Sequence, residues 1–180
     1  MAIKAVAMDV DGVLTDGTVM LDESGRESKR IHFADVMGIS IGRRAGLLFA
    51  LISGEDGPGL QAIAAKLGIT DVYPGCRDKA AALRDFATRH TLELAEICYI
   101  GDDLNDVAAM EISGLAAAPG DAQRAAAAAA TLTSTRPGGA GAVREIIEAL
   151  LSEIAPLGSR SAVAVPDESS GPTRTARTAP

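Results

Sequence analysis

The chain has 180 residues, of which 47% are hydrophobic and 23% charged, and its formal net charge is −7. These values fit one globular domain with its own core and exclude a wholly disordered or collagen-like chain. The acidic balance argues against a nucleic-acid or membrane partner, and no apolar run approaches the ~18 residues that a membrane span needs.

Short apolar runs alternate with helical patterns along most of the chain. In chain order we expect a buried strand at 3–8, a β-hairpin at about 18–33, a helix at 35–44, a strand at 47–52, a helix at 58–67, a strand at 71–73, a helix at 77–89, a strand at 97–100, a helix at 104–112, a strand at 115–118 and a helix at 143–154. Asp35 is the expected cap of the first helix, and residues 125–133 fit either a helix or a short strand. Residues 156–180 are rich in Ser, Thr, Pro and Ala and are expected to form a flexible or disordered tail after a domain of residues 1–155.

This alternation predicts an α/β fold, a doubly wound, Rossmann-like parallel sheet with helices on both faces. Ligands of such sheets bind outside the carboxyl ends of the strands. Asp9, Ser53 and Asp102 each follow a predicted strand, so the fold is expected to bring them to one edge.

Two acidic clusters follow two of these strands. Asp9 and Asp11 close the first strand, and Asp102, Asp103 and Asp106 follow a later one. Two carboxylates ~4 Å apart repel by about 4 kcal/mol at an effective dielectric constant near 20, so their convergence calls for a cation. Oxygen ligands without His or Cys nearby favour Mg²⁺ over zinc.

Two further groups suit a phosphate. The hydroxyl of Ser53 and the backbone N–H groups around Gly54 could hold phosphate oxygens. Lys79, near the start of a helix, could neutralise phosphate and carboxylates together. Each group alone is more often a helix cap or a solvated side chain, so they gain weight only beside the acidic clusters.

These motifs stand in a fixed order, namely Asp9-Val10-Asp11-Gly12-Val13, Ser53-Gly54, Lys79 and Gly101-Asp102-Asp103-Leu104-Asn105-Asp106. Their order resembles the four motifs of the haloacid dehalogenase superfamily of phosphotransferases. Segments 9–17 and 138–145 resemble its cap-less group, which includes the phosphatases of eight- and nine-carbon ulosonate phosphates. The resemblance covers about residues 3–152 and implies the superfamily fold with a small hairpin flap and no cap domain.

The resemblance also implies catalytic roles. Asp9 is expected to be the nucleophile that forms an aspartyl phosphate, and Asp11 the general acid and base. Ser53 and Lys79 are expected to hold the transferring phosphoryl group.

A magnesium site follows from the same resemblance. Asp9, the backbone carbonyl of Asp11 and Asp102 are expected to bind Mg²⁺, with Asp103 and Asp106 supporting them. The family's hairpins form a barrel between subunits, which implies a homotetramer whose active sites are completed by a neighbouring subunit. The expected partner besides a second copy is a small sugar phosphate.

The substrate depends on the residues after Ser53. Octulosonate phosphatases usually have arginine after Ser-Gly, whereas glutamate with a lysine eleven residues later resembles the nonulosonate type. Gly54, Glu55 and Lys66 are therefore expected to contact substrate, unless Glu55 caps the next helix and Lys66 is solvated. Val36 replaces a usual Gly or Ser of the family.

The favoured reaction is hydrolysis of a nine-carbon ulosonate 9-phosphate of the KDN or N-acylneuraminate type. The alternatives are 3-deoxy-D-manno-octulosonate 8-phosphate and another sugar or nucleotide phosphate. A signalling receiver domain would place its lysine after the acidic pair, and a non-catalytic oligomerisation module would not need the complete motif set. Cys76 and Cys98 match no zinc spacing, so we expect reduced thiols in a cytoplasmic protein.

Overall fold

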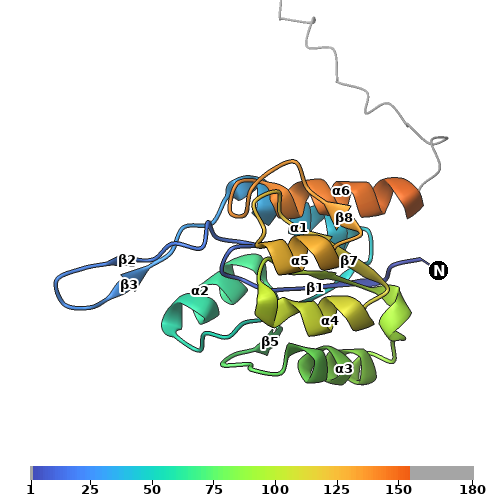
Figure 1. Cartoon of the computed structure of the whole chain (residues 1–180), viewed down its shortest axis with the longest axis horizontal. Coiled ribbons are helices and arrows are strands. Elements are labelled where there is room, and N and C mark those ends of the chain that lie inside the picture. The colour runs from blue at the N-terminus through green and yellow to red at the C-terminus, as the bar shows by residue number, and fades with distance from the viewer. Residues whose placement is uncertain (1, 155–180) are drawn as a thin grey trace, which may run out of the picture.

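A computed structural model describes residues 2–154, so the predicted tail at 156–180 lies outside the described residues. The main sheet contains β1 (Ala5–Met8), β4 (Leu48–Ile52), β5 (Asp71–Tyr73), β6 (Ile97–Ile100), β7 (Leu115–Ala118) and β8 (Leu132–Thr133). The α-helices are α1 (Phe33–Arg44), α2 (Pro58–Leu67), α3 (Lys79–Arg89), α4 (Val107–Ile112), α5 (Arg124–Ala129) and α6 (Ala142–Ile154). Two 3₁₀ helices, η1 (Leu94–Glu96) and η2 (Leu104–Asp106), and the hairpin strands β2 (Met20–Leu21) and β3 (Glu27–Ser28) complete the elements (Figure 1).

The sheet is parallel throughout, with the strand order β5-β4-β1-β6-β7-β8. The chain moves outward from β1 through β4 to β5, then crosses back to β6 on the other side of β1. This topology confirms the predicted doubly wound sheet. The order reverses between β1 and β6, which is where ligands of such folds bind.

Alternate side chains of each strand point to opposite faces of the sheet. Val6 and Met8 of β1 pack with α1, α2 and α6, whereas Ala5 and Ala7 pack with α3, α4 and α5. Both faces are thus covered, and every residue of β1 is buried. Burial on both sides explains why the strands are short, continuous apolar runs.

The hairpin (residues 18–32) projects from this body (Figure 1). It turns at the expected place, since the Gly25 N–H donates to the Asp22 carbonyl at 2.9 Å. Its strands β2 and β3 are only two residues long each, and the chain enters α1 at Phe33. Ile31 near its base packs against the core, but Val19, Met20 and Leu21 farther out are exposed, the last two by about two-thirds.

The prediction that Asp35 caps α1 was wrong. His32 is the cap, and its Nδ1 accepts the Ala34 N–H at 3.1 Å. Asp35 is buried in the first turn, where its carboxylate accepts the N–H groups of Gly141 (3.1 Å) and Arg144 (2.9 Å). The first N–H groups of a helix lack partners within it, so Asp35 serves the start of α6 instead.

The ambiguous segment 125–133 contains both expected elements, because α5 ends at Ala129 and β8 follows at Leu132. The expected helix at 77–89 begins two residues later, since Asp78 is its cap and accepts the Ala81 N–H at 2.9 Å. In the described part of the chain, none of the helices combines the length and apolar character that crossing a bilayer requires.

Candidate active site

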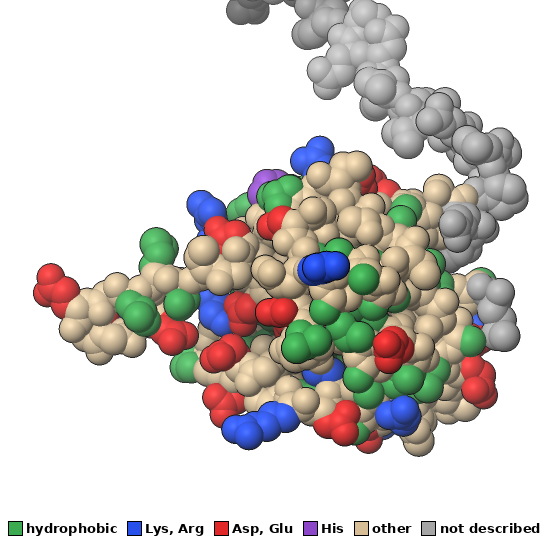
Figure 2. Space-filling model, in the orientation of Figure 1, with side chains coloured by type: hydrophobic (Ala, Val, Ile, Leu, Met, Phe, Trp, Pro, Cys, Tyr) green, Lys and Arg blue, Asp and Glu red, His purple; other side chains and the backbone are tan. Residues whose placement is uncertain are grey.

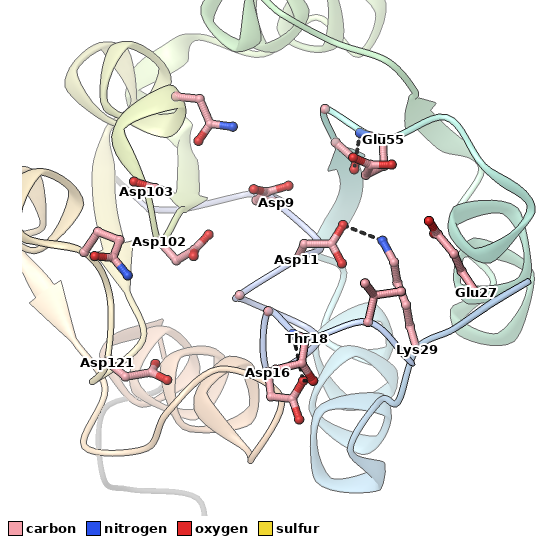
Figure 3. A pocket seen from close by; sticks show the side chains of 17 residues that line it. Asp9, Asp11, Asp16, Thr18, Glu27, Lys29, Glu55, Asp102, Asp103 and Asp121 are labelled. Carbon is pink, nitrogen blue, oxygen red and sulfur yellow. Dashed lines mark hydrogen bonds and ion pairs between the residues drawn. The ribbon is translucent and has the colours of Figure 1, made fainter. Parts of the chain in front are cut away.

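A pocket of about 550 Å³ lies at the carboxyl edge of the sheet, and Glu27 and Lys29 of the hairpin are among its lining residues (Figure 3). Loops after β1, β4, β6 and β7 contribute to its walls, together with the hairpin itself. Its acidic lining residues are Asp9, Asp11, Asp16, Glu27, Glu55, Asp102, Asp103 and Asp121. Among the described lining residues, Lys29 is the one Lys or Arg. Such a pocket repels an anion unless a cation is present.

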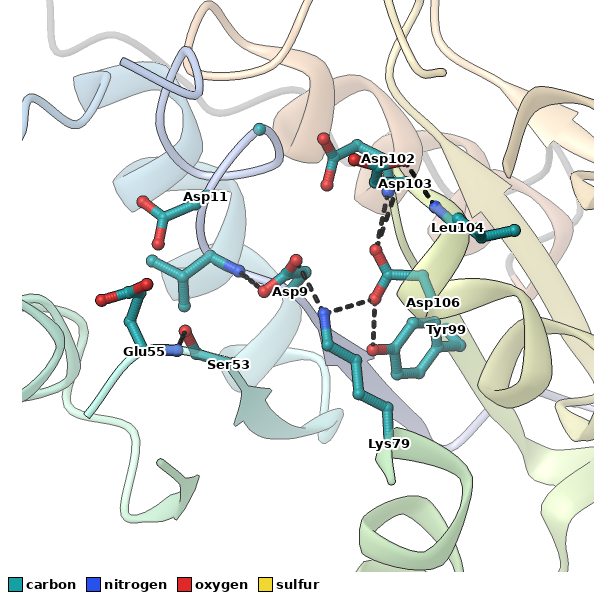
Figure 4. A network of polar contacts seen from close by, with 12 residues as sticks. Asp9, Asp11, Ser53, Glu55, Lys79, Tyr99, Asp102, Asp103, Leu104 and Asp106 are labelled. Carbon is teal, nitrogen blue, oxygen red and sulfur yellow. Dashed lines mark hydrogen bonds and ion pairs between the residues drawn. The ribbon is translucent and has the colours of Figure 1, made fainter. Parts of the chain in front are cut away.

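The pocket rests on four buried side chains, which we call the catalytic floor: Asp9, Lys79, Tyr99 and Asp106 (Figure 4). Lys79 Nζ lies 2.7 Å from Asp9 Oδ2 and 2.7 Å from Asp106 Oδ1. The Tyr99 hydroxyl donates to the same Asp106 oxygen at 2.8 Å. Asp9 Oδ1 accepts the Val10 N–H at 2.7 Å, so both of its oxygens are fixed. The lysine from α3 thus joins the ends of β1 and β6.

Burial sets the electrostatics of the catalytic floor. It raises the pKa of Asp9 to about 6, with a further rise from nearby Asp106 and an opposing effect of Lys79. Burial acts to lower the pKa of Lys79, but Asp9 and Asp106 outweigh it, and the pKa is raised. The ammonium is therefore held charged beneath Asp9 at neutral pH.

Asp102 supplies an unpartnered oxygen beside this floor. Its Oδ1 is buried and has no hydrogen-bond partner among the described residues. The pKa of Asp102 is raised to about 7 by burial, and then by the charges of Asp9, Asp106 and Asp103. A buried carboxylate oxygen without a donor is costly, unless a cation binds it.

The carboxylates of Asp9, Asp102 and Asp106 each place one oxygen within 4.8 Å of the others. Asp106 is already engaged, because its Oδ1 binds Lys79 and Tyr99 and its Oδ2 accepts the N–H groups of residues 102 and 103 at 3.1 and 3.3 Å. Each oxygen of Asp106 has two partners, each oxygen of Asp9 has one, and Asp102 Oδ1 has none, so Asp9 and Asp102 are the two carboxylates with lone pairs left for a cation. Hard oxygen donors of this kind fit Mg²⁺.

Gly12 allows the two acidic loops to approach one another. Its backbone has a φ of +85°, and a Cβ there would lie 2.0 Å from Asp102 Oδ2. A larger residue would displace Asp102 from the site. Glycine at this position is thus a requirement of the site geometry.

Asp11 lies higher on the pocket wall and is held by a residue that the sequence did not single out. Lys29 from the hairpin places Nζ 2.7 Å from Asp11 Oδ2 (Figure 3). The Thr15 hydroxyl donates to Asp11 Oδ1 at 3.3 Å. Sequence reasoning found no base near Asp11 because Lys29 is 18 residues away along the chain. A basic residue on the hairpin's returning leg was the available signal.

The loop after β4 carries the second predicted group. Ser53 is buried, and its Oγ accepts the Glu55 N–H at 3.1 Å. Gly54 and Glu55 line the pocket. Gly57, not Glu55, caps α2, and no side chain makes the cap hydrogen bond. The alternative of Glu55 as a helix cap was therefore wrong.

Two predicted residues take different positions. Asp103 lines the pocket and accepts the Leu104 N–H at 2.6 Å, so it caps η2. Lys66 does not line the pocket. Its Nζ lies 5.4 Å from the centre of the exposed Phe33 ring, on the outside of α2.

Comparison with known proteins gives the family. The sequence profile of the haloacid dehalogenase-like hydrolases matches residues 48–146. The chain is 34% identical to 3-deoxy-D-manno-octulosonate 8-phosphate phosphatase KdsC of Escherichia coli K12 over 83% of this chain and 79% of that protein. It is 36% identical to KdsC of Haemophilus influenzae over 83% of each chain. The chain belongs to the haloacid dehalogenase-like hydrolases.

Solved structures agree with this family. The 3-deoxy-D-manno-octulosonate 8-phosphate phosphatase of Moraxella catarrhalis, in complex with magnesium, phosphate and KDO, is 34% identical, with a TM-score of 0.81 over 83% of this chain and 86% of that one. A probable YrbI family phosphatase of Pseudomonas syringae has a TM-score of 0.83 at 35% identity, over 87% of this chain and 89% of that one.

Membership confirms the expected fold, and no cap domain is inserted within residues 2–154. It also confirms the expected enzyme class, a haloacid dehalogenase-type phosphatase. The predicted nine-carbon substrate gains no support from these relatives, several of which are named for the eight-carbon acid.

Proposed function

We propose that this chain is a Mg²⁺-dependent phosphatase for the phosphate ester of a 2-keto-3-deoxy sugar acid. The observation that carries the proposal is the arrangement of Asp9 above buried Lys79 and beside the unpartnered oxygen of Asp102. A carboxylate nucleophile, a fixed cation and a site for a divalent ion are what phosphoryl transfer to an aspartate requires. The similarity to KdsC phosphatases supports the sugar acid as the alcohol part of the ester.

The proposed reaction has two steps on the same face of the pocket. In the first, a carboxylate oxygen of Asp9 bonds to phosphorus, the ester bond to the sugar breaks, and Asp11 gives its proton to the sugar oxygen. In the second, Asp11 takes a proton from water, whose oxygen bonds to phosphorus and releases Asp9 with inorganic phosphate. Asp11 ends as it began, and the net reaction consumes one water.

Asp9, Asp102 and the backbone carbonyl of Asp11 would hold Mg²⁺, and Asp106 and Asp103 would support them. When bound, the ion neutralises charge on the phosphoryl oxygens and offsets their repulsion by the pocket's carboxylates. Ser53 and Lys79 would hold the phosphoryl group from the opposite side.

Two substrates have separate support. The relatives favour 3-deoxy-D-manno-octulosonate 8-phosphate, which we therefore place first. Glu55 in the pocket favours a nine-carbon ulosonate 9-phosphate, because its carboxylate could accept hydrogen bonds from the longer sugar's hydroxyl or amine groups. Gly54 beside it leaves room for the sugar.

Phosphate release with Mg²⁺ tests both substrates in one assay. A kcat/KM ratio of tenfold or more, about 1.4 kcal/mol at the transition state, decides for one acid. If kcat/KM is higher for the eight-carbon acid, we expect Glu55→Ala not to raise kcat/KM for that acid further. If neither acid is hydrolysed faster than a simple alkyl phosphate, the sugar-acid assignment fails.

The same proposal includes a homotetramer in the cytoplasm. Apolar side chains exposed on the hairpin, among them Met20 and Leu21, support an interface there (Figure 2). Lys66 lies outside its own pocket and would serve the pocket of a neighbouring subunit. Free Cys76 and Cys98 are consistent with a reducing compartment.

A further inference from the structure

Lys29 reaches the pocket from the hairpin rather than from the sheet. Its side chain is 12% exposed although the hairpin around it is open to solvent. The stem runs past the start of α2, where a side chain at Gly59 would contact it. Lys29 thus passes the first turn of α2 before its ammonium meets Asp11 in the loop after β1.

The contact is selective. Eight carboxylates line the pocket, yet the ammonium sits 2.7 Å from Asp11 Oδ2. The other oxygen of Asp11 has the Thr15 hydroxyl at 3.3 Å, a long hydrogen bond. No further side-chain contact holds Asp11 among residues 2–154. Lys29 is therefore the main restraint on the orientation of this carboxyl group.

We propose that Lys29 is a positioning residue that aims Asp11 at the oxygen of the leaving alcohol. This inference rests on the proposed function, in which Asp11 exchanges protons with the alcohol and with water. General acid–base catalysis needs the carboxyl within hydrogen-bond reach of the reacting oxygen, and a misplacement of about 1 Å can cost about 10²-fold in rate. Lys29 directly follows β3, so the residue that orients Asp11 belongs to the hairpin. The hairpin is thereby part of the catalytic machinery.

The next residue provides a matched control. Arg30 pairs with Asp16 at 2.7 Å on the same leg of the hairpin, but its side chain is 80% exposed. Both residues are cations that join the hairpin to the loop after β1. Only Lys29 contacts the proposed acid.

The test uses two phosphate esters that differ in their need for an acid. An alkyl alcohol must be protonated as it leaves, whereas p-nitrophenolate leaves without help. The value of kcat/KM reports the steps up to loss of the alcohol. A comparison of kcat/KM for the two esters therefore measures how much the enzyme contributes by protonating the leaving alcohol. We expect Lys29→Met to lower kcat/KM for a primary alkyl phosphate by about 10²-fold, and that for p-nitrophenyl phosphate by less than about threefold.

Three further results belong to the test. Lys29→Met should show a burst of p-nitrophenol, since Asp11 is also needed to hydrolyse the aspartyl phosphate. Lys29→Arg should regain most of the alkyl activity, and Arg30→Met should leave the ratio of the two esters unchanged. Lys29→Gln, whose thermal unfolding is measured beside the wild type, provides a second variant should Lys29→Met fold poorly.

An equal loss with both esters in a folded Lys29 variant would overturn the inference, as would the same ratio change in Arg30→Met. Failure of the proposed function looks different. A wild type that hydrolyses both simple esters but not the sugar-acid phosphates loses only the substrate assignment. A wild type inactive on every ester overturns both proposals.

Discussion

The catalytic floor and the hairpin differ in how well their side chains are matched by contacts within the chain. In the floor, Lys79 and Asp106 are nearly inaccessible, and every charged atom has a partner within the chain. In the hairpin, Met20 and Leu21 are 67% and 65% exposed and face solvent. The polar groups of the floor find their partners within one copy of the chain, whereas these two apolar side chains of the hairpin are left uncovered by the described residues.

This difference suggests that the two regions serve different parts of the function. Phosphoryl transfer depends on the ends of β1 and β6, which the sheet fixes to within hydrogen-bond distances. In our proposals the hairpin meets the leaving group and a neighbouring subunit. Among the described residues, its ion pairs to the loop after β1 are those of Lys29 and Arg30. Changes to the floor should therefore lower both activity and stability. Changes to the hairpin should affect assembly and, at Lys29, the rate for esters whose alcohol needs an acid.

The largest effect is expected for Asp9→Asn. An amide oxygen is a poor nucleophile and cannot form the aspartyl phosphate, so we expect turnover to fall by at least about 10⁴-fold. Steady-state phosphate release measures this. Glu111→Gln, an exposed change on α4, is the control and should behave as wild type. More than a few per cent of residual activity would contradict the assignment of Asp9.

Lys79→Met should be the most destabilising change. It leaves Asp9 and Asp106 buried without their shared cation, which costs about 3–5 kcal/mol. Urea unfolding in EDTA measures the loss. Lys66→Met, on the exposed side of α2, should change the free energy of unfolding by less than about 0.5 kcal/mol. Equal effects of the two variants would mean that the floor is not a stabilising unit.

The metal-free protein should lose stability as pH rises from 5 to 8. In the folded chain the pKa of Asp9 is raised to about 6 and that of Asp102 to about 7, both first by burial. The folded state therefore holds protons that the unfolded state, with ordinary carboxyl pKa values, releases near pH 4. The free energy of unfolding falls through this window and levels off above pH 7.

Mg²⁺ should reverse that trend, because it binds the ionised carboxylates of the folded state. Thermal unfolding in EDTA and in millimolar Mg²⁺, at pH 5 and pH 8, measures both effects. Asp102→Asn should flatten both pH profiles. A melting temperature that Mg²⁺ leaves unchanged at pH 8 would count against the metal site.

The smallest effect on stability is expected from the hairpin. Met20→Asp with Leu21→Asp removes apolar surface that is exposed in the single chain, and it should alter the free energy of unfolding of the dissociated chain by less than about 0.5 kcal/mol. It should nevertheless dissociate the tetramer, as light scattering would detect. Glu23→Ala, at the hairpin's turn, should leave the assembly intact. A wild type that is monomeric would refute the proposed assembly.

Much of the site at the sheet edge could be predicted from the sequence, and the hairpin's contacts could not. Asp9, Ser53 and Asp102 follow from one rule, that parallel strands bring their carboxyl ends to the same edge. Lys79 was predicted from the order of the motifs, and Tyr99 of the floor was not predicted.

The hairpin itself was predicted, but Lys29 meets Asp11 only because of the path by which its returning leg passes the pocket, and no local pattern specifies that path. Predicting the contact required the three-dimensional path of the hairpin.

The prediction that Asp35 caps α1 was wrong for a related reason. Its position before a helix matched the capping rule, but its partners at Gly141 and Arg144 lie more than a hundred residues away. The carboxylate of Asp35 can accept N–H groups of its own helix or unpaired N–H groups from distant parts of the chain. Which of them it accepts depends on how α1 packs against α6, and the local sequence does not specify that packing.

Trapping the phosphoryl group tests the central claim most directly. The Asp11→Asn variant, mixed with p-nitrophenyl phosphate and Mg²⁺, should form the aspartyl phosphate without an acid and then hydrolyse it slowly. After acid quenching and proteolysis, mass spectrometry should find one phosphoryl group per chain, on Asp9. A phosphoryl group on any other residue, or none on the chain while p-nitrophenol is released, would contradict the account.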